Sequence, residues 1–384
     1  MQIYFTEEHT AWRDTVRDFC EREIRPSLQK LDLSSPPSPE QIRALDDAWS
    51  GKGVYGEFPR NEDGKLDHIA FAILIEELSR IHHLPGFMAM QRISMPTLVA
   101  NMLDDAQKEQ FADLLPPTRA TIGGAFSEPA AGSDSGAVRT TAKRNADGTW
   151  SISGHKIWIS GASHVDALIA WTRVDKEIDP SGYGAFVVRR DTGYQVTPIK
   201  MMGLQGHEMC EVVFDNVVVP DIARIKGNAQ AAVLGTIGLA RPMTAVMATG
   251  YAQAALEMAI AYAKGREQFG KSIASFQLVQ KLLADMATGV MSCRLMQYQA
   301  INTLMREGEK AARVESSMAK AYCTETAWQV CSMGMEVYGA MGLTAEAEIE
   351  RLFRDARMLT VPDGTRQIHE LVIGRSLTGM NAFA

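Results

Sequence analysis

The segment VPDGTRQ at residues 361–367 places a single carboxylate beside a turn signal. Asp363 has no acidic neighbour, and the glycine that follows it makes a pair common in tight turns. Thr365 is a suitable N-cap for a helix that begins at Arg366. A lone carboxylate in this setting is either turn chemistry alone or a general base held within reach of a substrate proton. The turn by itself leaves both interpretations open.

A glycine- and serine-rich stretch is the second candidate for chemistry. It reads GGAFSEPAAGSDSGAVRTTAKR at residues 123–144, and ISGHKIWISGAS follows at residues 152–163. Such a loop lets backbone N–H groups approach a planar, polar ligand closely. An ordinary connector between strands has the same composition, so the loop alone decides nothing.

Other catalytic patterns are missing from the sequence. It contains no Walker loop, no GxGxxG between a strand and a helix, no HExxH and no nucleophile elbow. The eight histidines do not cluster at the spacing of metal ligands. The sequence therefore predicts no metal site and disfavours a hydrolytic triad.

Composition bounds the class of protein. The 384 residues exceed what one core usually holds, and 46% hydrophobic with 22% charged residues is ordinary for a soluble globular protein. A net charge of −7 gives no electrostatic reason to bind nucleic acid. The five cysteines fit no disulfide framework, which favours a reducing compartment. Without a signal peptide or a long apolar run, we expect a cytoplasmic protein that does not span a membrane.

Three regions differ in hydrophobic period. The first is helical; Thr6 is its first N-cap candidate, and we expect that helix to stop at Pro26. The second has short apolar runs separated by turns, including the hairpin signal NADGTW, with no helical stretch between strands. The third returns to long helices. The sequence predicts an α+β fold: an N-terminal helical domain at 1–120, a central, barrel-like antiparallel β domain at 121–225, and a C-terminal four-helix bundle at 226–384.

Together these segments resemble the acyl-CoA dehydrogenase family. AFSEPAAGSD and KIWIS look like the flavin-contacting loop and strand of that family. REQFGKSIASFQLVQKLLADM at 266–286 is similar to its C-terminal signature, and the segment at 337–368 resembles the one that ends in the catalytic residue. The resemblance extends over almost the whole chain, and the family fold is also helical, β, helical.

The resemblance implies an FAD enzyme of fatty acid or carboxylic acid metabolism. In the family, a base takes the α-proton of an acyl-CoA thioester while the β-hydride passes to the flavin. Donors at the thioester oxygen stabilise the enolate-like charge. Electrons then go to an electron-transfer flavoprotein. The FAD is held partly across subunits, which implies a homotetramer.

The resemblance also implies roles for individual residues. Phe126 and Ser127 should lie against the isoalloxazine ring, with Trp158 on its face and Ser160 near N5. An arginine should reach the diphosphate of a neighbouring subunit's FAD. The implied cofactor-binding set is Phe126, Ser127, Trp158, Ile159, Ser160, Arg266, Gln268, Phe269, Phe276, Gln277, Glu336, Val337, Gly339, Ala340, Thr365 and Gln367.

Asp363 occupies the position of the family base, which is usually Glu. Some members carry the Glu instead on the long helix of the third region, where this chain has Ala240. Asp is shorter by one methylene, and a displacement of about 1 Å can cost about 100-fold in rate. Three explanations stay open. In the first, the chain has shifted so that Asp363 still reaches the α-proton. In the second, Asp363 serves different chemistry, such as cyclic conjugated acyl-CoA formation or nitroalkane-oxidase-like oxidation. In the third, the base is weakened because the protein does another reaction, such as desulfination, or is a catalytically weak flavin-binding partner subunit.

Four further residues are candidates for contact with the substrate. Ser133 and Arg241 are expected near the CoA pantetheine or the rim of the site, and Gly364 leaves room for the thioester. Arg92 falls on a helix that in the family lines the bottom of the acyl pocket. It either pairs with an acidic acyl terminus or extends along the helix to the surface. A short, branched, cyclic or dicarboxylic acyl-CoA remains the expected substrate.

Overall fold

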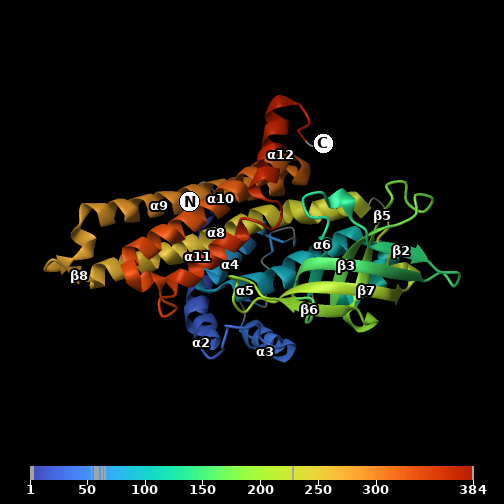
Figure 1. The fold of residues 1–384 in the computed structure, drawn as a ribbon, viewed down its shortest axis with the longest axis horizontal. Helices are drawn as coiled ribbons and strands as arrows, with labels where there is room; N and C mark the ends of the chain where they lie inside the picture. The colour runs from blue at the N-terminus through green and yellow to red at the C-terminus, as the bar shows by residue number, and fades with distance from the viewer. Residues whose placement is uncertain are drawn as a thin grey trace.

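The computed structural model describes residues 4–52, 54–55, 60–61, 64, 66–116, 118–226 and 229–382, without the side chains of residues 229–237. Helices fill most of the elongated molecule, and a curled sheet lies at one end (Figure 1). The chain passes from helices to strands and back to helices. The predicted α+β order of the fold is confirmed.

The N-terminal region consists of short helices around one apolar helix. Thr6 caps the first of them by accepting a hydrogen bond from the His9 backbone, as predicted. α4 is buried at every position from Ile69 to Ile81, so it packs among other helices on all sides. The helices are α1 (Glu7–Phe19), α2 (Arg25–Leu28), α3 (Pro39–Ser50), α4 (His68–Ile81), α5 (His83–Ala89), α6 (Met95–Met102) and α7 (Asp105–Gln110).

The prediction that the first helix stops at Pro26 is wrong. A π-helical turn at Cys20–Ile24 joins α1 to α2, and Pro26 lies in the first turn of α2. Proline is tolerated there because the first N–H groups of a helix have no partner within it. The helical path therefore continues to Leu28.

The central region is a seven-stranded sheet in the order β1-β4-β2-β3-β7-β6, with β5 paired to β4. β2–β3, β3–β7, β4–β5 and β6–β7 are antiparallel, whereas β4 runs parallel to β1 and β2. The hairpin signal NADGTW joins β2 to β3, with Gly148 at φ +86°. The strands are β1 (Ile122–Ala125), β2 (Thr141–Arg144), β3 (Trp150–Ser160), β4 (Ala167–Arg173), β5 (Tyr183–Arg189), β6 (Gln195–Ile199) and β7 (Met209–Val219).

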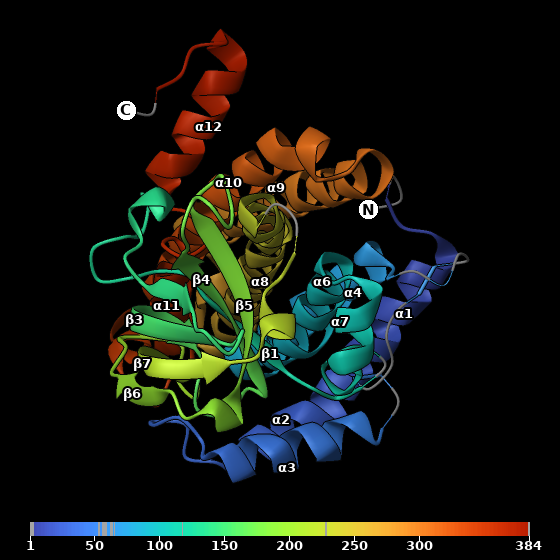
Figure 2. The same cartoon turned by 90° about the vertical axis from the view of Figure 1, so that its right-hand side faces the viewer.

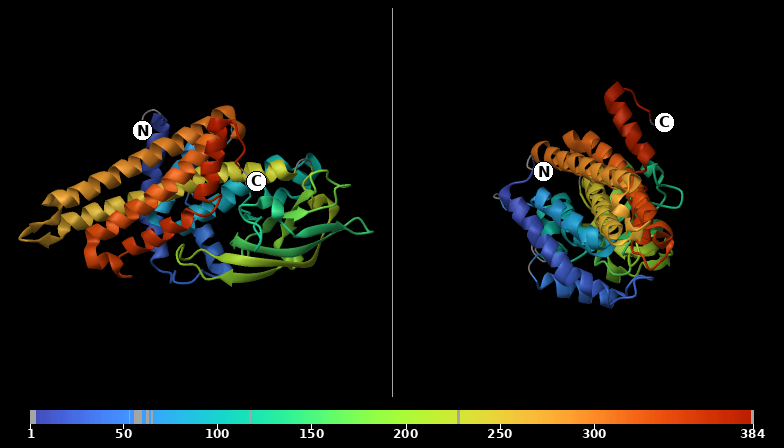
Figure 3. Two further views of the ribbon diagram at one scale, coloured as in Figure 1. Left: turned by 45° about the horizontal axis from the view of Figure 1, so that its top comes forward. Right: turned by 90° about the vertical axis from the view of Figure 1, so that its left-hand side faces the viewer.

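The C-terminal region is built on three long helices. α8 contacts both α9 and α10, and α11 packs on α8 and α10. α12 extends from the bundle, and the views in Figures 1 and 3 agree on this. The bounds are α8 (Ala229–Gly265), β8 (Glu267–Gln268), β9 (Lys271–Ser272), α9 (Gln277–Glu307), α10 (Glu309–Tyr338), α11 (Ile349–Leu359) and α12 (Arg366–Thr378).

The N-terminal and C-terminal helices share a hydrophobic core. Phe71 and Leu74 of α4 belong to the same buried cluster as Met247 and Tyr251 of α8. A second cluster fills the sheet and includes Val99 and Phe111 from the N-terminal region. Figure 2 shows the sheet and the N-terminal helices gathered around α8. Helices far apart in sequence therefore form one helical body beside the sheet.

No helix in the described part of the chain is both long and apolar enough to cross a bilayer.

The crossing of α4 and α8 depends on Gly250. A Cβ at this position would lie 2.5 Å from the backbone oxygen of Glu76 and 3.0 Å from the backbone nitrogen of Arg80. Gly250→Ala must push the two helices apart, so we expect a loss of about 1–3 kcal/mol in unfolding free energy by urea denaturation. Gly374→Ala in α12 is the matched control, because its Cβ meets no atom of the described chain within 4 Å. It should be neutral or stabilise by up to about 1 kcal/mol. Equal stabilities for the two variants would contradict the close crossing.

Candidate active site

Asp363 lies in the turn between α11 and α12. Its φ is +57° and that of Gly364 is +103°, so two consecutive residues adopt left-handed backbone conformations. Asp tolerates this region better than most residues, and glycine adopts it freely. Thr365 begins α12 as its N-cap and accepts a hydrogen bond from the Ile368 backbone, as the sequence indicates. The turn therefore holds a half-buried carboxylate just ahead of a capped helix.

The carboxylate of Asp363 contacts α8. Its Oδ2 accepts a hydrogen bond of 2.7 Å from the hydroxyl of Thr244. The same hydroxyl lies 3.0 Å from the backbone oxygen of Ala240, one helical turn earlier. Asp363 thus reaches the face of α8 on which Ala240 lies.

A buried lysine holds the turn from the other side. Lys320 of α10 is fully buried, and its Nζ donates to the backbone oxygens of Thr360 at 3.0 Å and Gly364 at 2.7 Å. These two carbonyls flank Asp363 in sequence. Burial lowers the pKa of Lys320 to about 8; Asp363 opposes this shift and Arg241 adds to it. The ammonium therefore supports the turn and places a positive charge behind it.

His369 of α12 packs against Gly364 in the turn. It is fully buried, and neither ring nitrogen has a hydrogen-bond partner in the described chain. Burial lowers its pKa to about 3, and the charges of Lys320 and Arg241 add to the shift. A Cβ at Gly364 would lie 3.1 Å from His369 Nε2. Glycine is needed at 364 both for its backbone conformation and for this contact.

Arg241 brings a second cation to the turn. Burial lowers its pKa, as does Arg313, while the negative charges of Asp363 and Glu309 raise it. Its Nε has no hydrogen-bond partner among the described residues. Arg241 therefore adds a buried positive charge near Asp363, with one donor that no described residue satisfies.

The predicted flavin loop and strand lie side by side. The Ile157 backbone donates to the backbone oxygen of Ser127 at 3.0 Å, and buried Lys156 donates to Phe126 O at 3.0 Å. Trp158 follows at φ +63°, within a register irregularity of β3, and is 54% exposed. Ile159 instead points into the core of the sheet. The sheet therefore presents an exposed indole next to the Phe126–Ser127 segment.

The remaining cofactor candidates lie in two places, the far end of the helical bundle and the segment after Asp363. Phe269 is 94% exposed on the β8–β9 hairpin, at the end of the bundle opposite the sheet (Figure 1). The end of α10 lies near this hairpin, because Tyr338 stacks on Tyr262 of α8 with centroids 4.0 Å apart. Thr365 and Gln367 instead follow the Asp363 turn. The group at the far end of the bundle comprises Arg266, Gln268, Phe269, Phe276, Gln277, Glu336, Val337, Gly339 and Ala340.

Two substrate candidates take distinct positions. Ser133 is exposed on the loop between β1 and β2. Arg92 is buried, and its guanidinium bonds Asp46 at 3.0 Å and the Ser50 hydroxyl, both on α3. The expectation that Arg92 extends to the surface is wrong, because Asp46 neutralises its charge inside the helical body. Burial raises the pKa of Asp46, and Arg92 opposes that shift.

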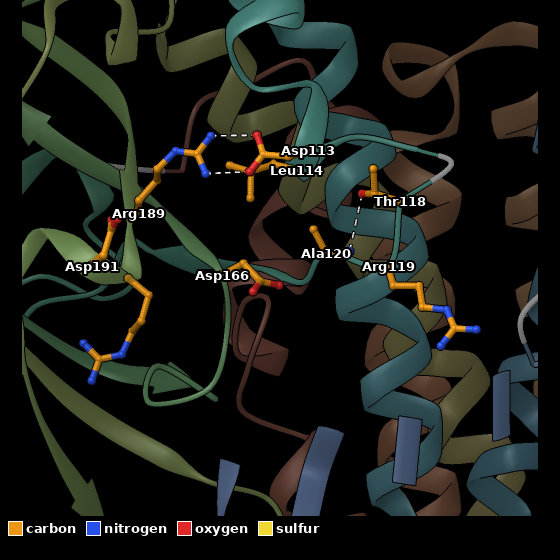
Figure 4. A pocket seen from close by; sticks show the side chains of 9 residues that line it. Asp113, Leu114, Thr118, Arg119, Ala120, Asp166, Arg189 and Asp191 are labelled. Atoms are coloured by element: carbon orange, nitrogen blue, oxygen red, sulfur yellow. Dashed lines mark hydrogen bonds and ion pairs between the residues drawn. The ribbon is translucent and has the colours of Figure 1, made fainter. Parts of the chain in front are cut away.

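A surface hollow lies apart from these residues. Figure 4 shows charged side chains around it, with Arg189 making two bonds of 2.7 Å to Asp113. Asp166 accepts hydrogen bonds from Thr121, and Arg119 bonds Asp47. The lining contains none of the predicted site residues. Within the described residues, no group of three His, Cys, Asp or Glu side chains could hold a metal ion.

Comparison with known proteins decides the family. Family models for the N-terminal, middle and C-terminal domains of acyl-CoA dehydrogenases match residues 6–118, 123–217 and 230–378. The chain belongs to the acyl-CoA dehydrogenase family. It is therefore an oxidoreductase of a flavoprotein family that acts on acyl-CoA thioesters.

Individual relatives match the chain from end to end. The 3-(aryl)acrylate reductase of Clostridium sporogenes is 32% identical over 382 residues, 98% of this chain and 100% of the relative. The cyclohex-1-ene-1-carbonyl-CoA dehydrogenase of Geobacter metallireducens is 32% identical over 381 residues, 97% and 99% of the two chains. The crystal structure of glutaryl-CoA dehydrogenase from Mycobacterium smegmatis has a TM-score of 0.87 at 29% identity, covering 100% of this chain and 98% of that one.

Sequence reasoning missed the three residues that surround the turn. Thr244 follows Ala240 by four residues, so both lie on one face of α8. That spacing could have found Thr244 once position 240, the alternative base position that the family resemblance implies, was placed opposite Asp363. Lys320 and His369 gave no comparable signal, because lysine and histidine occur at many helical positions and only the fold brings these two to Asp363.

The buried His369 gives a testable pH dependence. Its ordinary pKa of 6.5 falls to about 3 in the folded chain, so below about pH 6.5 only the unfolded state binds this proton. His369→Leu should therefore lose less stability than the wild type on acidification. The difference should be about 1.4 kcal/mol per pH unit in unfolding free energy. Urea unfolding between about pH 7 and pH 5 measures it; parallel curves for the two proteins would rule out a neutral, buried His369.

Proposed function

We propose that this chain is an FAD-dependent acyl-CoA dehydrogenase in which Asp363 takes the α-proton of the thioester. The observation that carries the proposal is the contact of Asp363 with Thr244, beside Ala240. The family base occurs at position 363 or at position 240, and here both positions meet at one hydroxyl. A shorter side chain at 363 can therefore still serve the common site.

The residues of the β domain fit a flavin. The exposed indole of Trp158 follows Ile157, whose backbone bonds Ser127, so a flat apolar face lies beside a polar loop segment. A bound FAD supplies the two-electron acceptor that removal of the β-hydrogen requires. In our proposal Trp158 packs on the ring, Ser127 and Ser160 donate to its polar edge, and Phe126 excludes water.

The candidate FAD-binding residues form two groups that lie far apart in one copy of the chain. The β domain lies at one end of the bundle and the exposed Arg266 and Phe269 at the other (Figure 1). This separation supports the proposal of a homo-oligomer, namely a tetramer. In it, each FAD contacts the β8–β9 hairpin of a neighbouring copy. An electron-transfer flavoprotein is the proposed electron acceptor.

The chain's own groups prepare proton removal. Lys320 fixes the carbonyls on both sides of Asp363, and Thr244 fixes its carboxylate. The left-handed turn at Asp363 and Gly364 keeps the space beside the carboxylate free of a side chain at 364. Positioning of a base contributes about 100- to 10,000-fold to such reactions.

A cyclic acyl-CoA is the second candidate substrate class. The relative from Geobacter metallireducens is named for a cyclic substrate, and the use of Asp fits the cyclic, conjugating chemistry considered from the sequence. An acidic acyl group gains no support from Arg92, because that guanidinium already pairs with Asp46.

Removing the base is the central test. Asp363→Asn keeps the shape and the left-handed preference of the side chain, but it cannot accept the proton. We expect anaerobic bleaching of the bound flavin by acyl-CoA to slow by about 100- to 10,000-fold. The control is the spectral shift on ligand binding, which should persist. Bleaching at the wild-type rate would reject Asp363 as the base.

A panel of thioesters tests the substrate class. Purified protein should be yellow, and straight-chain, branched, cyclic and dicarboxylic acyl-CoAs should bleach it at different rates. We expect Arg92→Met to change the rates for neutral and dicarboxylic thioesters by the same factor. A selective loss with dicarboxylic thioesters would return Arg92 to the acyl pocket. A protein that stays colourless after reconstitution with FAD would contradict the proposed function.

A further inference from the structure

One hydroxyl lies between the carboxylate of Asp363 and a backbone carbonyl. Thr244 Oγ1 is 2.7 Å from Asp363 Oδ2 and 3.0 Å from the Ala240 backbone oxygen. The side chain of Thr244 is 3% exposed, so water does not readily replace either contact. A hydroxyl has a single hydrogen to donate. It can therefore donate to only one of these two oxygens at a time.

The two orientations of this hydrogen match the two protonation states of the acid. With Asp363 ionised, the hydrogen points to Oδ2 and makes a charge-assisted bond. With Asp363 protonated, the acid donates to Oγ1, and the threonine hydrogen turns to the carbonyl of Ala240. In both states the carboxyl group stays hydrogen-bonded to Thr244 Oγ1, so it does not have to move. The carbonyl of Ala240 receives the hydroxyl hydrogen only when Asp363 is protonated.

We infer that Thr244 is a positioning residue that holds Asp363 in one place both before and after it takes a proton. This inference rests on the proposed function and adds to it a reason why a short base is sufficient. A half-buried carboxyl group without such a partner would be free to rotate once its charge is lost. The hydrogen bond to Thr244 on α8 fixes the carboxyl group in both states. A base held at one position does not need the additional length of a Glu side chain.

The proton balance is simple. One C–H bond of the substrate breaks and one O–H bond forms on Asp363, while the threonine keeps its own hydrogen throughout. The electron pair of the broken bond stays in the substrate and forms the new double bond. A bound FAD, as in the proposed function, would supply the acceptor for the β-hydrogen together with its electron pair. Thr244 only rotates, so it gains and loses no atom.

The other charged groups around Asp363 do not offer the same support. Lys320 of α10 and Arg241 of α8 interact with it electrostatically, but neither can accept a hydrogen bond from a protonated acid. His369 of α12 faces the adjacent Gly364, and its low pKa of about 3 keeps it neutral above that pH. Arg366, the next cation on α12, is exposed and bonds Glu370.

Two further charges lie behind Arg241. Arg313 and Glu309 of α10 shift its pKa in opposite directions. Removing the threonine hydroxyl alters none of these charged residues. A change in pH dependence on that substitution therefore reports on Thr244 itself.

Thr244→Val and Thr244→Ser test the inference in the FAD-loaded protein. Valine has nearly the same shape but no hydroxyl, whereas serine keeps it. We expect Thr244→Val to slow flavin bleaching by saturating acyl-CoA about 10- to 100-fold, the effect of one hydrogen bond to a charged group. The binding constant for the acyl-CoA should stay close to that of the wild type. Thr244→Ser should restore most of the rate.

The pH profile separates positioning from a general structural effect. Without the threonine donor the ionised base loses a charge-assisted bond, while the protonated base loses a weaker one. The rising limb of the bleaching rate should therefore move to higher pH in Thr244→Val and return toward the wild-type position in Thr244→Ser. Thr244→Ala provides a second hydroxyl-free variant if the valine does not fold.

The outcomes distinguish this inference from the proposed function. If Asp363→Asn is slow but the hydroxyl-free variants bleach at the wild-type rate and pH, Thr244 has no positioning role. A Thr244→Ser variant as slow as Thr244→Val would also overturn the inference. If Asp363→Asn bleaches normally, the proposed base is wrong, and the inference falls with it.

Discussion

The buried ammonium of Lys320 bonds the carbonyls of Thr360 and Gly364, and the position of the Asp363 turn depends on these bonds. A left-handed conformation at a non-glycine residue costs about 1–3 kcal/mol and persists only where the surroundings enforce it. Burying an ammonium is also unfavourable, as the lowered pKa of Lys320 shows. The two costs are offset together, because the carbonyls that the turn exposes are the acceptors that the ammonium needs.

This constraint explains why the site needs the whole helical body. The turn is supported by α10 through Lys320, by α8 through Thr244, and by α12 through His369. α8 is held in turn by α4, whose backbone approaches Gly250 without space for a side chain. The shared core of the N-terminal and C-terminal helices therefore fixes the surfaces that meet at Asp363. The sheet contributes a separate surface, on which Trp158 and Ser127 lie.

Much of the fold followed from local patterns. Thr6 and Thr365 cap helices as their sequence contexts indicate, and the Asp-Gly signal forms the β2–β3 hairpin. The stop at Pro26 failed because a π-helical turn placed the proline at the start of a new helix segment, which local propensity does not reveal. The surface position of Arg92 failed for a related reason. Its partner Asp46 is on another helix, and a contact between helices has no local sequence signature.

The sequence by itself determined the order of the elements and the family, and it singled out Asp363 as the candidate base, because periodicity, capping residues and spaced motifs are local properties of the chain. Only the tertiary structure decided what holds that carboxylate. Thr244, Lys320 and His369 are separated from Asp363 by distances in sequence that no pattern spans, except through the helices that pack around the turn. Hydrogen bonds act over about 3 Å, so the identity of these partners depends on packing. The same packing places the β8–β9 hairpin, which carries Phe269, and the sheet, which carries Trp158, at opposite ends of the folded molecule.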